Sequence, residues 1–331
     1  MKAVIPVAGV GTRLRPHTHT QPKALITVAG KPILSHIIDE LKEAGFSEFV
    51  FIIGYLGEKV RDFITEKYPD LDSEFVVQTS REGIGHAIWL AKDQIAGADQ
   101  LVIALGDTIF DMDMQKLIAM EHSALATKPV LDPRRFGVAE IDPEGFITKL
   151  VEKPSIPKSN IALVGIYKVR EVDELLAALK YIIDNDIRTK NEFQLTDALM
   201  HMIEKGVKFK SFNISNWFDC GKKEAVLETN AILLKREEYT TSDHKNFANT
   251  IIIPPVNISD DVDIKGSIIG PNVSIGSNAS IENSIIRESI IGPYAKITTS
   301  LLHNSLIGND AQLRGMSQSL NIGDSAELNY D

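Results

Sequence analysis

The sequence predicts an α/β domain built on a mostly parallel sheet, followed by a left-handed parallel β-helix. Two observations support this prediction. From Met1 to Leu105, short apolar runs alternate with helical stripes, a pattern typical of right-handed βαβ units on a parallel sheet. After Asn249 an apolar residue recurs every six positions between Gly, Asn, Ser and Asp, which indicates a solenoid of stacked coils.

The elements of the first domain follow from its apolar spacing. Strands are predicted at residues 1–7, 49–53, 74–77 and 101–105, and helices at 32–44, 58–68 and 85–95. Later short strands at 138–141, 148–152 and 162–168 indicate an antiparallel excursion of this Rossmann-like sheet. Helices at 172–181 and 195–205, a strand at 207–212 and a helix at 224–238 complete the domain.

The β-helix prediction depends on a repeated tetrapeptide. Ser267-Ile-Ile-Gly270, Ser289-Ile-Ile-Gly292 and Ser305-Leu-Ile-Gly308 share one pattern. Isoleucines at this spacing stack inward, and each coil covers its neighbour. At about 18 residues a coil, the segment predicts roughly four coils. We therefore expect two domains, at residues 1–240 and 249–325.

Composition limits the classes of protein that fit. The 331 residues are 44% hydrophobic and 24% charged, as in a globular protein. A formal net charge of −10 argues against broad nucleic-acid binding. Cys220 is the one cysteine, which rules out an intrachain disulfide and suits a reducing compartment. With neither a signal-peptide pattern nor an apolar run long enough to span a membrane, we expect a cytoplasmic protein without membrane partners.

A glycine-bearing loop follows the first strand. Gly9 and Gly11 permit positive φ and let backbone N–H groups approach a ligand. Five cationic side chains precede Asp39, the first acidic residue. This pattern suits a polyanion such as a triphosphate. The P-loop string is absent, and the third glycine of the dinucleotide fingerprint is replaced by Leu14.

A longer string carries a family resemblance. Its parts are A-G-x-G-T-R-L-x-P from Ala8 to Pro16, then Pro22-Lys23, then Gly30-Lys31-Pro32. This string resembles the signature of the sugar-1-phosphate nucleotidylyltransferases, although Val10 stands where many members have a second glycine. The resemblance covers residues 1 to about 235 and implies the nucleotide-diphospho-sugar transferase fold. It also implies that Ala8, Gly9, Gly11 and Thr12 contact the nucleotide.

Two aspartates are candidate metal ligands. Asp107 follows a predicted buried strand in Leu-Gly-Asp, and Asp219 lies in Asp-Cys-Gly. Mg²⁺ is typically held by one or two carboxylates plus substrate phosphates. The resemblance implies that both aspartates bind Mg²⁺, the expected cofactor. Asp111 and Asp113 match no ligand position of the family and are expected to be solvated.

Further motifs match the base and sugar halves of such a site. Gln78 and Gly83, in Gln-x-x-x-x-Gly-x-x-x-Ala, resemble the pair that recognises thymine or uracil. A side-chain amide can donate and accept at a pyrimidine edge. Resemblance in the sugar half assigns main-chain contacts to Gly137 and Gly165, sugar hydroxyls to Glu152 and Glu192, and the sugar phosphate to Lys153.

The resemblance implies a Mg²⁺-dependent enzyme that joins a sugar 1-phosphate, most simply glucose 1-phosphate, to dTTP or UTP and releases pyrophosphate. Arg13, Lys23 and Lys153 would neutralise and hold the reacting phosphates. Residues 132–164 match the long thymidylyltransferases best, whereas Leu195-Thr196-Asp197 and Asp219-Cys220-Gly221 are more like the uridylyltransferases.

Two other classes stay open. One is an acyltransferase using the β-helix, for which His303 would be the only histidine after His244. The other is a non-catalytic relative that senses sugar nucleotides. We expect the β-helix to assemble copies of the chain, with a polar ending at Asp324, Glu327 and Asp331 that blunts the last coil.

Overall fold

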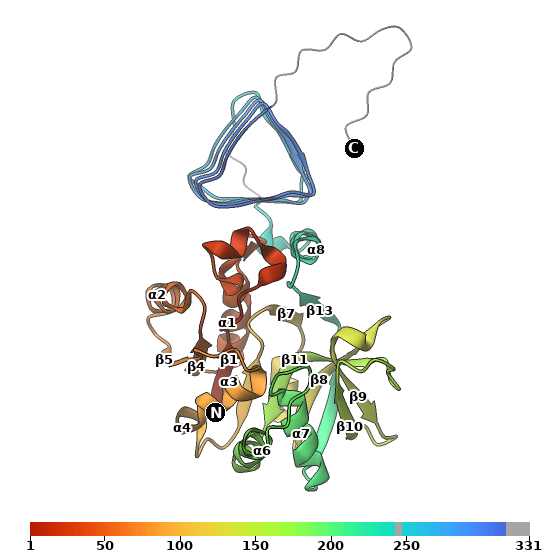
Figure 1. The fold of residues 1–331 in the computed structure, drawn as a ribbon. Coiled ribbons are helices and arrows are strands. Elements are labelled where there is room, and N and C mark those ends of the chain that lie inside the picture. The colour runs from red at the N-terminus through yellow and green to blue at the C-terminus, as the bar shows by residue number, and fades with distance from the viewer. Residues whose placement is uncertain (242–246, 316–331) are drawn as a thin grey trace. The chain divides into compact units, whose positions relative to one another are not determined.

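The fold was analysed in a computed structural model, which describes residues 1–241 and 247–315 (Figure 1). The chain divides into two compact units, Met1–Thr229 and the part that begins at Asn230. No helix of the described residues is long and apolar enough to cross a membrane.

A nine-stranded mixed sheet forms the centre of the first unit. Its parallel part has the order β6–β1–β4–β5, and β11 continues it antiparallel to β6. The strands are β1 (Lys2–Pro6), β4 (Glu48–Ile53), β5 (Asp72–Val77), β6 (Leu101–Ala104), β8 (Ser123–Pro129), β9 (Gly137–Ile141), β10 (Ile147–Glu152), β11 (Ile161–Val169) and β12 (Phe209–Asn213). The predicted α/β class and the antiparallel excursion are both confirmed.

Helices cover both faces of this sheet. The helices of the chain are α1 (Ile33–Glu43), α2 (Gly57–Lys67), α3 (Ile84–Leu90), α4 (Lys92–Ile95), α5 (Met114–Ala119), α6 (Val172–Asp184), α7 (Leu195–Glu204) and α8 (Lys223–Leu233), of which α8 crosses the division between the two units. The side chains of Val4, Val50 and Ile52 share one core with α3, α6 and α7. The alternate residues Phe49 and Phe51 are stacked on the other face, as expected for period-two strands.

Two predicted helices differ from the observed ones. The predicted helix at 85–95 is broken at Ala91, whose N–H bonds to the carbonyl of Ile88 in a tight turn between α3 and α4. The predicted closing helix at 224–238 ends at Leu233, and a short 3₁₀ turn follows at Glu237–Tyr239.

Among the elements that were not predicted are β7 (Thr108–Asp111), β8, α5 and β13 (Asn216–Asp219). β7 and β13 pair antiparallel in a small separate sheet, although they lie far apart in sequence. A pairing of such short segments carries no local signal, because each strand is defined only by its partner. A second small sheet joins β2 (Thr27–Val28) to β3 (Lys31–Pro32).

The second unit contains three parallel sheets of four strands, stacked into a three-sided β-helix (Figure 1). The first side holds β14 (Ile251–Ile252), β17 (Ile268–Ile269), β20 (Ile285–Arg287) and β23 (Leu301–His303). The second holds β15 (Val256–Ile258), β18 (Val273–Ile275), β21 (Ile290–Ile291) and β24 (Leu306–Ile307). The third holds β16 (Asp263–Lys265), β19 (Ser280–Glu282), β22 (Lys296–Thr298) and β25 (Gln312–Arg314). The predicted left-handed β-helix and its four coils are confirmed.

The coils are shorter than the predicted 18 residues. Ile264 pairs with Ile281, 17 residues on, and Ile281 pairs with Ile297, 16 residues on. The shortened corners place a positive-φ residue, such as Asn283, directly before a serine. The Ser284 hydroxyl donates to the carbonyl of Glu282 (2.8 Å) and accepts from the N–H of Ser300 (3.1 Å). At these corners a serine side chain makes a hydrogen bond to the neighbouring coil, and the turn is one residue shorter.

The β-helix core consists of the inward residues of all three sides, among them Val273, Ile275, Ile281, Ile291 and Ile297. The structure describes this unit as far as Gly315. The rest of the predicted domain, including Asp324, Glu327 and Asp331, lies outside the described residues.

Candidate active site

The glycine loop sits at the carboxyl end of β1, the end where ligands bind in open α/β sheets. Gly11 has φ 65° and caps a 3₁₀ turn at Thr12–Leu14. A Cβ at Gly11 would lie 2.9 Å from the Cβ of Lys23, so only glycine fits there. The loop therefore covers the stem of Lys23, whose side chain is buried in spite of its charge.

Lys23 is paired with the first candidate metal ligand. Its Nζ lies 2.5 Å from Oδ2 of Asp107, which follows β6. Burial alone would raise the pKa of Asp107, but the adjacent Lys23 ammonium lowers it below its usual value. Asp107 is therefore an ionised carboxylate at neutral pH, and the ammonium is held at the point where phosphates would approach the loop.

Asp219 reaches the same place through the β7–β13 pair. It lies opposite Thr108 in the register of that pair, and the N–H of Cys220 donates to the carbonyl of Asp107 (3.2 Å). Burial and the charge of Asp107 raise the pKa of Asp219. A Cβ at Gly221 would lie 2.5 Å from Nη2 of Arg13 and 2.8 Å from Oδ1 of Asp219. Because Gly221 has no side chain, the guanidinium of Arg13 can pack beside Asp219.

These two carboxylates fit a Mg²⁺ ion. The negative charge of Asp107 is countered by Lys23. The ionised form of Asp219 is destabilised by burial and by the charge of Asp107. A divalent cation between them would relieve that repulsion. Among the described residues no group of three or more His, Cys, Asp or Glu is placed to hold a metal. Mg²⁺ is usually held by one or two carboxylates, and water and phosphate oxygens supply its remaining ligands.

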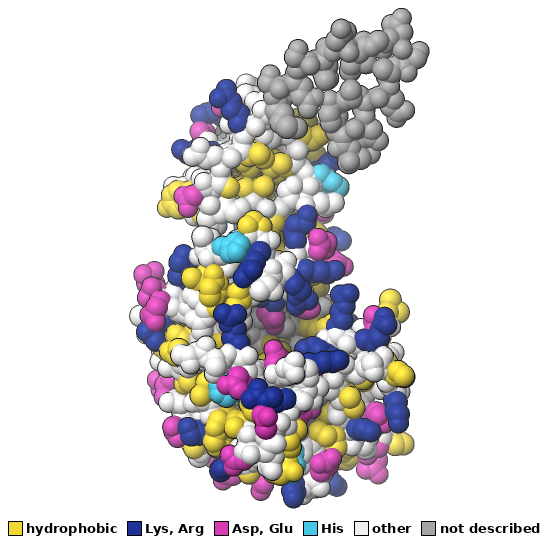
Figure 2. All heavy atoms as spheres, viewed as in Figure 1, with side chains coloured by type: hydrophobic (Ala, Val, Ile, Leu, Met, Phe, Trp, Pro, Cys, Tyr) yellow, Lys and Arg dark blue, Asp and Glu magenta, His cyan; other side chains and the backbone are white. Residues whose placement is uncertain are grey.

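A pocket of about 420 Å³ opens beside Asp107, which lines it, whereas Asp219 is not a lining residue. Figure 2 shows Lys and Arg side chains gathered around a hollow in this face of the first unit. The pocket is lined by the predicted nucleotide residues Ala8, Gly9, Gly11, Thr12, Gln78 and Gly83, by Lys23 and Asp107, and by Glu192. Arg81 also lines the pocket. It was not predicted, although its place two residues before Gly83 in the same turn was a usable signal.

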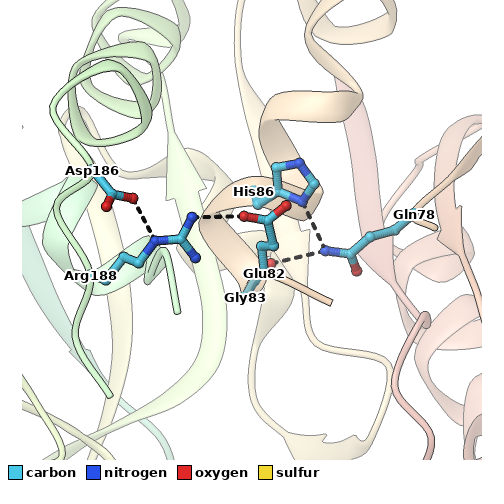
Figure 3. Close-up of polar contacts among 6 residues, drawn as sticks. All are labelled: Gln78, Glu82, Gly83, His86, Asp186 and Arg188. Atoms are coloured by element: carbon cyan, nitrogen blue, oxygen red, sulfur yellow. Dashed lines mark hydrogen bonds and ion pairs between the residues drawn. The ribbon is translucent and has the colours of Figure 1, made fainter. Parts of the chain in front are cut away.

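The amide of Gln78 has a fixed orientation (Figure 3). Its Nε2 donates to the carbonyl of Gly83 (3.1 Å) and lies 3.4 Å from Nδ1 of His86. Because a carbonyl can only accept, the nitrogen of the amide must be the atom beside Gly83. No donor among the described residues bonds to Oε1 of Gln78, so this oxygen remains available to a ligand in the pocket.

Two of the predicted sugar residues, Gly137 and Glu152, lie together. Oε2 of Glu152 accepts from the Thr196 hydroxyl (2.7 Å), and its Oε1 lies 3.1 Å from Nζ of Lys153. A Cβ at Gly137 would lie 3.1 Å from both Glu152 Oε2 and Thr196 Oγ1. The absence of a side chain at Gly137 therefore leaves room for the carboxylate of Glu152 and the hydroxyl of Thr196.

Of the other predicted sugar residues, Glu192 lines the pocket, and Gly165 adjoins Leu105, which also lines it. Glu192 accepts from the amide of Gln194 (2.9 Å), and the carbonyl of Gly165 accepts from the N–H of Leu105 (2.9 Å). Burial raises the pKa of Tyr167, and the charges of Glu152 and Asp107 raise it further. Glu152 of the predicted sugar residues and Asp107 of the predicted metal ligands therefore both lie near the Tyr167 hydroxyl. The positioning partners Thr196 and Gln194 lacked a predicted role.

Two acidic residues do not join the site. Asp113 caps α5 by accepting from the N–H of Lys116 (3.0 Å), and Asp111 accepts from Asn216 (3.1 Å) on β13. Their contacts are those of a helix cap and a strand pair, so neither is a candidate ligand.

Comparison with known proteins identifies relatives of this chain. A family model described as nucleotidyl transferase matches residues 2–236. The chain is 35% identical over 243 residues to the low-salt glycan biosynthesis nucleotidyltransferase Agl11 of Haloferax volcanii. This match covers 71% of the chain and 66% of that protein, so the chain spans slightly less than two thirds of that relative's length.

A second relative extends through the β-helix. The bifunctional protein GlmU of Methanococcus vannielii is 34% identical over 328 residues, covering 95% of the chain and 73% of that protein. Among solved structures, a Bacillus anthracis protein titled as a glucose-1-phosphate thymidylyltransferase matches with a TM-score of 0.60 at 29% identity. That match covers 70% of this chain and 94% of the other.

Proposed function

The chain belongs to the nucleotidyl transferase family, and from that premise we propose that it makes a nucleoside-diphosphate sugar and pyrophosphate from a sugar 1-phosphate and dTTP or UTP. The observation that carries the proposal is one pocket that combines a glycine loop, a buried lysine paired with Asp107, and an amide held for base recognition. The names of the relatives agree with this class of reaction.

The reaction needs positioning and charge neutralisation. An oxygen of the sugar phosphate forms a bond to the α-phosphorus of the triphosphate. The bond from that phosphorus to the bridging oxygen breaks, and pyrophosphate leaves with the electron pair. Because the nucleophile is already an anion, no general base is required. Lys23 and Arg13 would neutralise the triphosphate, and the backbone N–H groups of the glycine loop would cradle it.

Asp107 and Asp219 would hold Mg²⁺, which supplies charge neutralisation to the phosphates when bound. Support comes from the raised pKa of Asp219 and from its approach to Asp107 through the β7–β13 pair. When substrate binds, the Lys23 ammonium would interact with a substrate phosphate as well as with Asp107.

Base selection would rest on Gln78. With Nε2 occupied by the carbonyl of Gly83, its Oε1 can only accept a hydrogen bond. Uracil and thymine present an N–H between two carbonyls, whereas cytosine presents an unprotonated ring nitrogen there. The amide therefore favours dTTP and UTP over CTP, and purines are expected to be poor substrates in this pocket.

The sugar would be held by the two carboxylates. Glu152 and Glu192 would accept bonds from sugar hydroxyls, Gly137 and Gly165 would make main-chain contacts, and Lys153 would meet the phosphate. Glucose 1-phosphate is the proposed acceptor. We favour dTTP as donor because residues 132–164 resemble the long thymidylyltransferases, a view that fits the Bacillus anthracis neighbour. A preference for UTP is the alternative.

The test is a matrix of dTTP, UTP, CTP, ATP and GTP against glucose 1-phosphate, N-acetylglucosamine 1-phosphate and galactose 1-phosphate, with pyrophosphate release as readout. Turnover with dTTP or UTP and at least one sugar phosphate is expected. Binding without pyrophosphate release by any pair would indicate a non-catalytic sensor and overturn the proposal. Robust use of CTP would overturn the role assigned to Gln78.

A further inference from the structure

Two loops that carry different halves of the site are joined to each other by their backbones. One is the turn after β5, which holds Gln78 and Gly83; the other is the segment before α7, which holds Glu192. The N–H of Phe193 donates to the carbonyl of Glu82 (2.7 Å), and the N–H of Gly85 donates to the carbonyl of Phe193 (2.8 Å). The base half and the sugar half therefore share a pair of hydrogen bonds.

Glycine makes this approach possible. Gly83 has φ 104°, and a Cβ on it would lie 2.9 Å from the Cβ of Glu192. A Cβ on Gly85 would lie 2.8 Å from the carbonyl oxygen of Phe193. At this separation a shift of either loop moves the other, so Gln78 and Glu192 do not take up their positions independently.

Arg188 joins the same two loops through its side chain (Figure 3). Its Nη2 lies 2.8 Å from Oε2 of Glu82, and its Nε lies 2.6 Å from Oδ1 of Asp186. The guanidinium carbon lies 3.9 Å from the centre of the Phe193 ring, within the range of a cation–π contact. Arg188 thus contacts Glu82 of the turn and, in its own segment, both Asp186 and the buried ring of Phe193.

We propose that Arg188 is a positioning residue that ties the base-recognising turn to the sugar-binding loop, so that occupation of either half of the site strengthens binding in the other. This inference rests on the proposed function for the identity of the two ligands. Arg188 need not touch substrate or the reacting atoms for this role.

The physical basis is shared ordering. A ligand on Gln78 must order the turn that carries it, and the tie passes that order to Glu192, so the second ligand meets a site that is already arranged. An isolated surface ion pair contributes little. Here the guanidinium is also stacked on a ring and oriented by Asp186, and the neighbouring carboxylates Asp186 and Glu82 raise the pKa of Arg188.

The first test needs no ligand. Hydrogen exchange would be followed at the amides of Gly85 and Phe193, which form the bonds between the loops. In Arg188→Ala both amides should exchange about fivefold to tenfold faster, the scale expected for loss of a cation–π contact together with an ion pair. Exchange that changes at neither amide, or at one alone, would overturn the inference.

Arg61→Ala is the matched control. Arg61 also pairs with a glutamate (Glu58, 2.9 Å) and lies over a phenylalanine ring (Phe75, 5.4 Å), but these partners belong to α2 and to strand β5 and not to either loop. It should leave the two amides and the kinetics unchanged. Equal effects of both substitutions would mean that Arg188 matters only for general stability.

The second test measures coupling. Affinity for glucose 1-phosphate would be measured with and without a non-hydrolysable dTTP analogue, by calorimetry. In the wild type the analogue should tighten sugar-phosphate binding about fivefold or more, and the reverse experiment must give the same factor. In Arg188→Ala this factor should fall toward one, whereas Arg188→Lys, which keeps the charge but not the planar fork, should retain part of it.

The outcomes separate the two proposals. A wild-type protein that releases no pyrophosphate with any substrate pair contradicts the proposed function. The hydrogen-exchange experiment then still tests, by itself, whether Arg188 links the two loops. A wild-type enzyme that turns over but shows no coupling, or an Arg188→Ala variant that keeps the wild-type coupling factor, overturns the inference about Arg188.

Discussion

The two units of this chain obtain their structure in opposite ways. In the β-helix, Ile264, Ile281 and Ile297 occupy equivalent positions, and each is buried by its neighbours one coil away. In the first unit, Asp107 and Asp219 meet only because β7 pairs with a strand far along the chain. One unit is specified by a local repeat, the other by contacts between distant segments.

This difference separates stability from chemistry. A repeated core has many equivalent positions, so a single change there weakens a coil without touching a reacting group. The site of the first unit has no such redundancy, because Lys23, Asp107 and Asp219 interact with one another and do not recur along the chain. Substitutions in the two units should therefore affect different measurements, and the following experiments test that separation.

The largest effect is expected at the two aspartates. Asp107→Asn and Asp219→Asn each remove one negative charge from the proposed metal site. Turnover should fall on the order of a thousandfold, about 4 kcal/mol of transition-state stabilisation. Steady-state pyrophosphate release at saturating Mg²⁺ checks this result. Melting temperature serves as the control for folding, and near-normal turnover in either variant would contradict the metal assignment.

Ile281→Ala should affect stability alone. Ile281 is inward-facing and almost fully buried in the β-helix core, so its truncation should cost about 2–5 kcal/mol in that unit's unfolding free energy. The matched control is Ile253→Ala, an isoleucine of the same unit that is 41% exposed. Chemical denaturation checks the stability. A large loss of turnover per folded site would contradict the separation of the two units.

Acid should weaken the first unit through His36. Burial lowers the pKa of His36 to about 4, against about 6.5 in an unfolded chain. The folded state therefore keeps His36 neutral, while the unfolded state gains a proton below pH 6.5. The contribution of His36 to stability is complete above pH 6.5 and is lost as pH falls toward 4, by ~3 kcal/mol in total.

His36→Gln should remove that part of the pH dependence. Unfolding free energies of the wild type and the variant would be measured between pH 7 and 4. The control is His303→Gln, at an exposed position on β23 of the β-helix, which should keep the wild-type slope. An unchanged slope in His36→Gln would show that other groups dominate the acid response.

A smaller effect is expected from the serines of the shortened corners. Ser284→Ala removes a hydroxyl that donates to Glu282 and accepts from the N–H of Ser300. The loss leaves a backbone N–H without its partner, at a cost of about 1–2 kcal/mol. Thermal unfolding measures it, with Ser280→Ala, at an outward-facing position on β19, as control. Equal stability of the two variants would show that the hydroxyl does not determine the corner.

The smallest effect on chemistry is expected from removing the β-helix. Truncation after Lys235 should change pyrophosphate release per site by no more than about twofold, because solenoid repeats are stabilised by their own neighbours. We propose that the β-helix assembles copies of the chain, since Ile251, Ile285 and Leu301 form an exposed apolar column on one side. Light scattering should show an oligomer that the truncation dissociates. A full-length monomer would contradict assembly.

The sequence alone determined the elements that are defined locally. The glycine loop was found because positive φ at Gly11 requires glycine, and the parallel strands were found because their apolar runs are continuous. The β-helix core was found because one spacing repeats through the unit. The candidate site residues could be named from motifs, and the structure brings Gln78, Gly83, Lys23 and Asp107 to one pocket.

The tertiary structure decided what depends on distant partners. The β7–β13 pair and the contact of Arg188 with Glu82 have no local signal, since each arises where segments far apart in sequence meet. The coil length also escaped the sequence, because a serine hydroxyl replaces a residue of backbone at the short corners. Local propensity defines a segment, but only packing defines which segments become neighbours.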